Sequence, residues 1–219
     1  MPRTRVSART PVRRRIDGEL TRRKVLDAAV QSIMENGYYH TSSNEIARRA
    51  GVTWGTLQHQ FGSREGLLLA VLEESWEDLQ EAVGTAVIRG DTLEDRLAAV
   101  LDVLTEHYGV RAHLAQLQIL LDLTQNPKTS DGTKQAALAH GRSLARAWKP
   151  LFECALGEAA QEDDLVVFAF KTLRGYLVGE LIATRITPSR GRAHQHALLV
   201  QGVAAAIRAE ARTRHIRID

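Results

Sequence analysis

Apolar side chains recur along this chain at spacings of three and four residues, which is the period of an amphipathic helix. The first such stripe lies in residues 19–36 and is closed by Gly37, and another runs from about Leu67 to Val83. Later stripes predict helices over 92–108, 111–124, 134–156, 163–184 and 189–212, of which the third is kinked or split at Lys149-Pro150. The pattern therefore predicts an all-α protein of about nine to ten helices.

Two shorter helices are predicted between residues 37 and 67. Ser42 stands three residues before Glu45, which is the spacing of a capping box, and Gly51 ends the helix that this box begins. A second helix follows at once, with Thr53 as its cap. Two short helices around so tight a turn are typical of a helix-turn-helix, whose second helix enters the major groove of DNA. The alternative is a plain helical hairpin inside a bundle.

The composition agrees with a helical globular protein. Of 219 residues, 44% are hydrophobic and only 5% are aromatic, and good helix formers are abundant. No run of about eighteen apolar residues is present, and the N-terminus lacks the apolar segment of a secretory signal, so we expect a cytoplasmic protein with no membrane partner. Cys154 is the only cysteine, which leaves no partner for an intrachain disulfide.

Charge is distributed unevenly along the chain. Residues 1–70 hold 12 Lys and Arg against 6 Asp and Glu, a net charge of +6, whereas the rest carries a net charge of −3. A basic part joined to an acidic one suggests that the first part meets a polyanion. Residues 1–16 are rich in arginine and contain two prolines, so we expect a disordered basic arm there. Such an arm either follows DNA phosphates or serves as a solubilising tail.

Motifs of catalysis are absent from the sequence. There is no HExxH zinc motif, no phosphate-binding P-loop and no GxSxG nucleophile motif. His194 and His196 are two positions apart, which places them on different faces of a helix and argues against a shared metal. We therefore expect no enzyme, no cofactor and no metal site.

Several short runs stand at fixed spacing around the predicted helix-turn-helix: Glu45-Ile46-Ala47, Ala50-Gly51-Val52, Gly55-Thr56-Leu57, and Phe61 to Leu67. With these runs, the segment from about Leu20 to Leu72 resembles the N-terminal DNA-binding domain of the TetR family of transcriptional repressors. The resemblance covers roughly a quarter of the chain. It implies a helix-turn-helix DNA-binding domain over 17–66, followed by a helical effector-binding and dimerisation domain over 67–219.

The resemblance also implies which residues contact DNA. Phosphate contacts would come from Thr41, Ser42, Ser43, Gln58 and Arg64, and base contacts from Thr53, Trp54, Thr56 and His59. Gln58, Gln60 and Arg64 depart from the tyrosine, histidine and lysine that are common in the family, but each can still donate a hydrogen bond to a phosphate. For Trp54, packing in the core is an equally weighted alternative.

The last two predicted helices combine apolar residues with many small ones. Small residues let helices approach closely, and two such helices from each of two protomers would form a four-helix interface, as the TetR resemblance also implies. A homodimer would present two reading helices to a palindromic operator in double-stranded DNA. The alternative is that these helices pack within one chain. The small residues are Ala169, Gly175, Gly179, Ala183, Ala197, Gly202, Ala204, Ala205 and Ala206.

Polar side chains interrupt the apolar stripes of the middle helices, as they do in pockets for small molecules. We expect an effector pocket lined by His107, His113, Gln116, Trp148 and Tyr176, drawn from a wider set that includes Tyr108 and Arg174. For any one of these residues, a surface position or a satisfied core position is the alternative. Most of the remaining wall is Leu, Val, Ile and Phe, so the expected ligand is a largely apolar small molecule.

These expectations favour a sequence-specific transcriptional regulator, a repressor whose operator affinity is lowered by the effector. Two other functions stay open. A nucleoid-associated or cell-division protein would bind many DNA sequences alike and need no effector, and a carrier of apolar ligands would not bind DNA at all.

Overall fold

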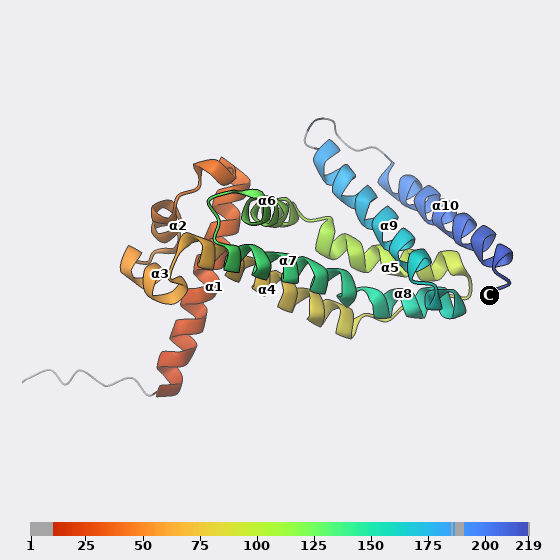
Figure 1. The fold of residues 1–219 in the computed structure, drawn as a ribbon, viewed down its shortest axis with the longest axis horizontal. Coiled ribbons are helices and arrows are strands. Elements are labelled where there is room, and N and C mark those ends of the chain that lie inside the picture. The colour runs from red at the N-terminus through yellow and green to blue at the C-terminus, as the bar shows by residue number, and fades with distance from the viewer. Residues whose placement is uncertain (1–10, 185, 187–190, 219) are drawn as a thin grey trace, which may run out of the picture. The chain divides into compact units, whose positions relative to one another are not determined.

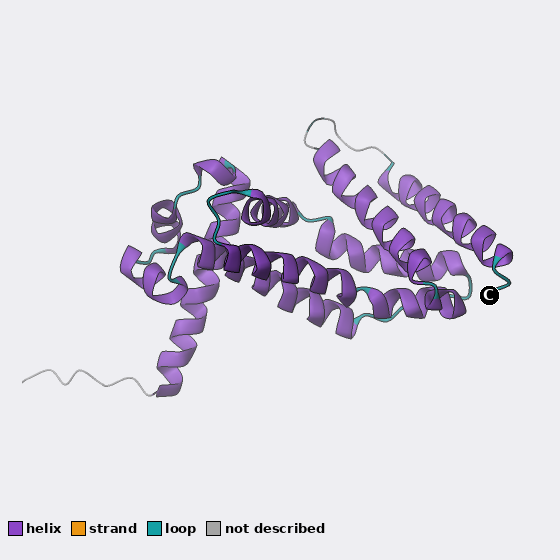
Figure 2. Cartoon of the chain, in the orientation of Figure 1, coloured by secondary structure: helices purple, strands orange, loops and turns teal. Residues whose placement is uncertain are grey.

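The computed structural model describes residues 11–184, 186 and 191–218, and every regular element in this part of the chain is a helix (Figure 1). These residues form ten α-helices joined by loops and short 3-10 turns (Figure 2), which confirms the all-α class and the expected number of helices. None of these described helices is both long and apolar enough to cross a bilayer. The chain divides into two compact units, one ending at Val71 and the other beginning at Leu72.

The first unit is a small helical domain in which α1 supports the others. Its elements are α1 (Pro11–Asn36), the 3-10 turn η1 (Tyr38–His40), α2 (Ser43–Ala50), α3 (Trp54–Phe61) and the start of α4 (Arg64–Thr85). Helix α2 packs against α1, because Val25, Ala29 and Ile33 on α1 and Ile46 on α2 are all buried. Burial of these stripes fixes the short helices that by themselves would be too short to be stable in water.

Helix α1 begins earlier than the sequence predicts. The apolar stripe suggested a start at Glu19, whereas the helix begins at Pro11, a residue whose fixed φ and missing N–H suit the first turn of a helix. Residues 11–16 of the expected disordered arm are therefore helical, which corrects that prediction. Residues 1–10 of the arm lie outside the described residues.

The second unit is a bundle built around α5. It comprises the rest of α4, α5 (Leu93–Tyr108), α6 (Arg111–Gln125), α7 (Asp131–Ala147), α8 (Lys149–Leu156), the 3-10 turn η2 (Gly157–Gln161), α9 (Asp163–Ala183) and α10 (Arg192–Thr213). Helix α5 contacts α8, α9 and α10, while α7 packs on α6. Leu97, Val100 and Leu104 of α5 are fully buried in this core, together with Phe152 of α8 and Leu173 of α9.

Local sequence signals explain most helix ends in the second unit. Thr92 and the carboxylate of Asp95 form a complete capping box at the start of α5. The predicted break near Lys149-Pro150 is confirmed, because α7 ends at Ala147 and α8 begins at Lys149. Helix α7 starts at Asp131, three residues before the predicted Lys134, because the hydroxyl of Ser130 caps it.

Two arginines of the last helix tie it to the rest of the second unit. Arg208 donates both terminal nitrogens to the carboxylate of Glu94 on α5. Arg214, just after α10, donates to Glu162 and Asp164 at the start of α9 and to Glu210 on α10, at 2.7–3.0 Å. These ion pairs fix the direction of α10 along the unit.

Candidate nucleic-acid interface and effector site

The N-terminus of α2 is exposed and is capped by the Ser42 side chain alone. The hydroxyl of Ser42 accepts a hydrogen bond from the Glu45 amide at 3.2 Å, as predicted. The Glu45 carboxylate does not complete the capping box: Arg48 donates to both of its oxygens at 2.8 and 2.9 Å, and this contact lowers the pKa of the carboxyl. Ser42 is exposed and Ser43 half-buried, so this end of α2 is open to an anion such as a phosphate.

Helix α3 presents a polar face to solvent and an apolar residue to the core. Thr53 caps the helix by accepting from the Thr56 amide at 3.1 Å, and the two threonine hydroxyls lie 2.9 Å apart. Leu57 is fully buried and fixes the rotation of α3 about its axis. Gln58 and His59 are exposed. This amphipathic arrangement suits a helix that reads the edges of bases.

Trp54 lies at the surface, at the first turn of α3. Its side chain is 47% exposed, which rules out the alternative of core packing. A solvent-exposed indole at the start of a capped helix can offer an N–H donor and a flat apolar face to a partner.

Gly51 and Gly62 mark the two ends of the segment that contains α3. Both have positive φ, 67° and 71°, a region that glycine enters at little cost. The Gly51 amide bonds to the Arg48 carbonyl, and Val52 bonds to Ala47, which closes the tight turn between α2 and α3. At the other end, Gln58 donates its side-chain amide to the Gly62 carbonyl, which leaves its side-chain oxygen for other partners.

Thr41 and Arg64 both make contacts within the domain. The burial of Thr41 corrects its prediction as a phosphate contact, whereas the same prediction for the half-buried Arg64 stays a prediction. The Thr41 side chain is buried, and its hydroxyl donates to the Gly37 carbonyl at 3.0 Å. The Arg64 guanidinium donates to the Tyr38 hydroxyl and to the carbonyls of Tyr38 and Thr41 at 3.2–3.3 Å, and it lies 4.7 Å from the centre of the Tyr38 ring. Arg64 therefore joins the turn before α2 to the first turn of α4.

Tyr39 and His40 are surface residues of the same region that the sequence did not single out. Tyr39 is 86% exposed and His40 is exposed, and both directly precede the open end of α2. The sequence contains one signal, the adjacent tyrosines Tyr38 and Tyr39. In the structure the Tyr38 ring is buried and the Tyr39 ring stands edge-on to it, with the ring centres 5.4 Å apart. An exposed phenol next to a helix N-terminus is a further donor for a phosphate oxygen.

In the second unit, three of the five predicted effector-site residues meet in one aromatic cluster, and a fourth, Gln116, lies beside it. The indole N–H of Trp148 donates to the Tyr108 hydroxyl at 2.6 Å, and the rings of His107 and His113 contact Tyr108 at 4.8 and 4.6 Å. Gln116 lies 3.3 Å from His113 Nδ1. We call Tyr108, His107, His113, Trp148 and their neighbour Phe170 the aromatic cluster.

Burial determines the ionisation of the aromatic cluster. Burial, together with the charge of Arg174, lowers the pKa of His107 to about 4 and that of His113 to about 3. It also raises the pKa of Tyr108 to about 12. Both imidazoles are therefore neutral near pH 7.

Tyr176 lies apart from the aromatic cluster, contrary to prediction. Its hydroxyl donates to Gln195 on α10 at 3.0 Å, and its ring meets His196 edge-on at 5.5 Å. Helical spacing placed Tyr176 on α9 correctly, but the residue faces α10 and not α5. Among the described residues no group of three or more His, Cys, Asp or Glu is arranged to hold a metal ion.

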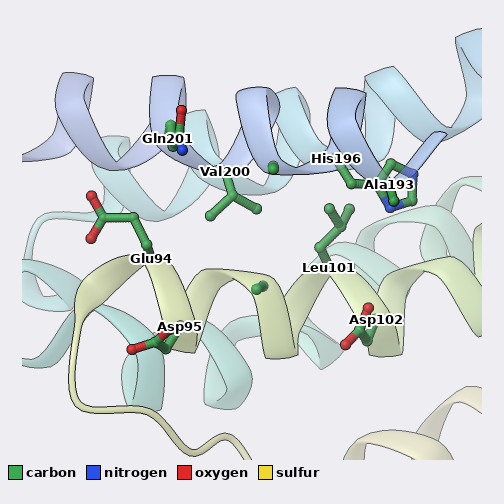
Figure 3. Close-up of a pocket in the computed structure, with 10 residues that line it drawn as sticks. Glu94, Asp95, Leu101, Asp102, Ala193, His196, Val200 and Gln201 are labelled. Atoms are coloured by element: carbon green, nitrogen blue, oxygen red, sulfur yellow. The ribbon is translucent and has the colours of Figure 1, made fainter. Parts of the chain in front are cut away.

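Clefts open between helices of the second unit. One, of about 330 Å³, lies between α5 and α10, where Leu101 and Val200 point toward one another and Asp102 lies at the edge (Figure 3). A second cleft, of about 390 Å³, lies between α4 and the α7–α8 segment and is lined by Trp76 and Arg146 among others.

The outer faces of α9 and α10 are apolar and exposed. Val167, Phe168 and Ile182 on α9 and Leu198 on α10 are 41–53% exposed. The small residues of these helices divide into two groups: Ala169 and Ala204 are buried in the core of the chain, and the others lie at the surface. The alternative of packing within one chain therefore applies only to the first group.

Residues 25–71 match the family model described as bacterial regulatory proteins, tetR family. The fatty acid metabolism regulator protein of Bacillus subtilis is 30% identical over 46% of this chain and 50% of its own length. The HTH-type transcriptional regulator BetI of Brucella anthropi is 32% identical over 38% of this chain and 43% of its own. The chain thus spans half or less of the length of these curated relatives.

Solved structures share the fold over most of the chain. A TetR family transcription regulator from Marinobacter aquaeolei aligns with a TM-score of 0.59 at 18% identity, covering 89% of this chain and 97% of its own. The regulator FadR from Bacillus subtilis in complex with stearoyl-CoA aligns with a TM-score of 0.55 at 18% identity, covering 84% and 96%. At these identities the likeness concerns the fold.

Proposed function

We propose that this chain, whose N-terminal domain belongs to the tetR family of bacterial regulatory proteins, is a homodimeric transcriptional repressor that a small molecule releases from its operator. The exposed face of α3 is the observation that carries the proposal. A helix of eight residues that is capped at Thr53, anchored by the buried Leu57 and polar on its outer side has the form of a reading helix.

The DNA contacts divide between positioning and reading. Ser42, Ser43 and the newly recognised Tyr39 lie at or next to the open end of α2, where donors suit phosphate oxygens. Gln58 would contribute a phosphate contact from α3, and Thr53, Trp54, Thr56 and His59 would contact the bases. The hydroxyls of Thr53 and Thr56 each keep a donor or a lone pair for a base edge, because Thr53 Oγ1 accepts from the Thr56 amide and the two hydroxyls share one further hydrogen bond.

Dimerisation through α9 and α10 is supported by the apolar side chains that these helices leave exposed. Side chains as large as Phe168 and Ile182 cost free energy in water, and their burial against a second copy would remove that cost. A two-fold interface would then present two copies of α3 to the half-sites of a palindromic operator.

The effector would bind at the aromatic cluster in the second unit. Neutral imidazoles, an indole and two phenyl or phenol rings form a site in which apolar walls carry a few polar atoms, which is the usual character of small-molecule pockets. A related fold has been seen with a small molecule bound, since the FadR structure contains stearoyl-CoA. The effector would act by preferring the conformation with the lower operator affinity.

Selection of bound sequences from a random pool of duplex DNA tests the proposal. The wild-type protein is expected to enrich one palindrome, and Trp54→Ala and Gln58→Ala should each weaken binding to it by about 1–3 kcal/mol. Gln161→Ala, at an exposed glutamine in the second unit, is the matched control and should bind normally. Enrichment of many unrelated sequences would instead support the nucleoid-associated alternative, and the absence of DNA binding at low ionic strength would support a carrier.

A further inference from the structure

Arg174 on α9 is a half-buried cation without a counter-ion. Its guanidinium lies 4.9 Å from the centre of the Tyr108 ring, and among the described residues it forms no ion pair. Arg208 and Arg214 in the same unit differ from Arg174, because each forms an ion pair with one or more carboxylates. A half-buried guanidinium normally gains such a partner, because desolvation of a lone charge is costly.

Next to Arg174, two buried nitrogen atoms also have no partner. His113 is 3% exposed, and its Nε2 atom accepts or donates no hydrogen bond, and the same holds for Nε2 of His107. Leaving a buried polar atom unpaired is unfavourable, so such atoms point to a missing group. The Gln116 oxygen faces His113 Nδ1 at 3.3 Å, which puts the imidazole proton on Nδ1. Exchange of the oxygen and NH₂ of Gln116 by rotation of its amide moves that proton to Nε2, which can then donate to a ligand oxygen.

Apolar rings adjoin these polar atoms. The indole of Trp148 stacks on Phe170 with ring centres 6.4 Å apart, and Phe152 meets Phe170 edge-on at 6.2 Å. Arg174 is close enough to the imidazoles for its charge to contribute to their low pKa values. One cation, two potential donors and a wall of rings are thus adjacent to one another within the second unit.

We propose that Arg174, His113 and His107 bind the anionic group of the effector, and that the effector is an amphiphile with a carboxylate on an apolar body. The carboxylate would pair with the guanidinium and accept from the imidazoles, while the apolar body would lie against Trp148 and Phe170. This replaces the largely apolar ligand that the sequence suggested. The inference deepens the proposed function, since it names the chemical class of the molecule that would release the repressor.

Three ligands with the same ten-carbon chain separate the head group from the tail. Decanoate, decanol and decyltrimethylammonium are titrated into the full-length protein without DNA, and binding is followed by calorimetry and by tryptophan fluorescence. Decanoate is expected to bind at least tenfold more tightly than decanol, and the cation should not bind. Equal affinity for decanoate and decanol, or no binding of decanoate at millimolar concentration, would overturn the proposal.

Variants assign the preference to Arg174. Arg174→Gln should lower decanoate affinity at least tenfold and leave decanol unchanged, whereas Arg174→Lys should keep part of the preference for the anion. Arg146→Gln is the matched control, since Arg146 lies beside the cleft between α4 and the α7–α8 segment. A loss of binding in Arg146→Gln with Arg174→Gln unaffected would place the anion elsewhere and refute the assignment. If Arg174→Gln does not fold, the head-group series and Arg174→Lys still decide.

The DNA measurement distinguishes failure of the site from failure of the function. A protein that binds decanoate but no duplex retains the anion site and loses the repressor proposal. A protein that binds its operator but no anion retains the repressor proposal and loses this site. Release of operator by decanoate in the wild-type protein, but not in Arg174→Gln, is the result that both proposals together predict.

Discussion

The two buried histidines of the aromatic cluster make the second unit less stable in mild acid. Their pKa values are lowered in the folded state, to about 4 for His107 and about 3 for His113, whereas an unfolded chain has histidines near 6.5. Below pH 6.5 the unfolded state therefore binds protons that the folded state does not. The stability that these neutral imidazoles preserve is complete above pH 6.5 and is lost as the pH falls toward their folded pKa values.

The size of the effect follows from the same pKa values. Between pH 7 and pH 5 the free energy of unfolding should fall by about 2 kcal/mol for each imidazole, hence by about 4 kcal/mol for both. This is a large part of the roughly 5–15 kcal/mol that stabilises a typical protein. The lowered pKa of His140, which is also caused by burial, acts in the same direction. Carboxylates with lowered pKa values, such as Glu94, lose their contribution only at lower pH.

Urea unfolding followed by circular dichroism at pH 7, 6 and 5 measures this slope. Protein concentration must be constant, because a dimer gains apparent stability with concentration. The double variant His107→Gln, His113→Gln is compared with the wild type. Between pH 7 and pH 5 its free energy of unfolding should fall by about 4 kcal/mol less than that of the wild type, whatever its stability at pH 7. If wild type and double variant show the same slope, the imidazoles are not neutral in the folded protein and the argument fails.

Three further predictions concern the helix ends and faces. Ser42→Ala removes the side-chain cap of α2 and should lower the midpoint of thermal unfolding, at a cost of about 1 kcal/mol. Ser63→Ala removes the same type of cap from α4 and should have an effect of the same size. Arg64→Ala should cost about 2 kcal/mol of stability, because it removes the hydrogen bonds of the guanidinium to the Tyr38 hydroxyl and to the carbonyls of Tyr38 and Thr41. Phe168→Glu should shift the protein from dimer to monomer in analytical ultracentrifugation, since it puts a charge on the exposed apolar face of α9.

Controls give each of these predictions a contrary outcome. If Arg64→Ala unfolds at the wild-type temperature and loses only DNA affinity, the side chain is a phosphate contact after all. A Phe168→Glu protein that stays dimeric would move the interface away from α9, and the exposed Glu158→Gln in η2 should leave the dimer unchanged. Normal stability of Ser42→Ala would mean that the open helix end needs no hydroxyl.

Local signals in the sequence were sufficient for the helix ends. Ser42, Gly51 and Thr53 were predicted in their observed roles, because a cap depends on a residue and on the amides within three positions of it. The capping box at Glu45 was half wrong for a related reason: a carboxylate can choose between a backbone amide and a nearby arginine, and Arg48 is the stronger partner.

Contacts between distant residues were beyond the same reasoning. Arg64 and Tyr38 are 26 positions apart, and nothing in their spacing shows that the guanidinium turns inward to the carbonyls of η1. The sequence placed Tyr176 on the correct helix but predicted the wrong neighbouring helix. The helical period shows which face a residue lies on, and it does not show which other helix packs against that face. His107 and His113 were found because both interrupt apolar stripes on consecutive helices.

Trp148 belongs to two helices at once, since it ends α7 and begins α8. Its carbonyl accepts from the amides of Leu151 and Phe152, while Pro150 provides no amide of its own to continue the ladder of α7. The joint between the two helices is thus a single residue, and the indole on that residue is part of the wall of the aromatic cluster. An effector that displaces the indole would therefore also change the angle between α7 and α8, because the same residue contacts the ligand and joins the two helices.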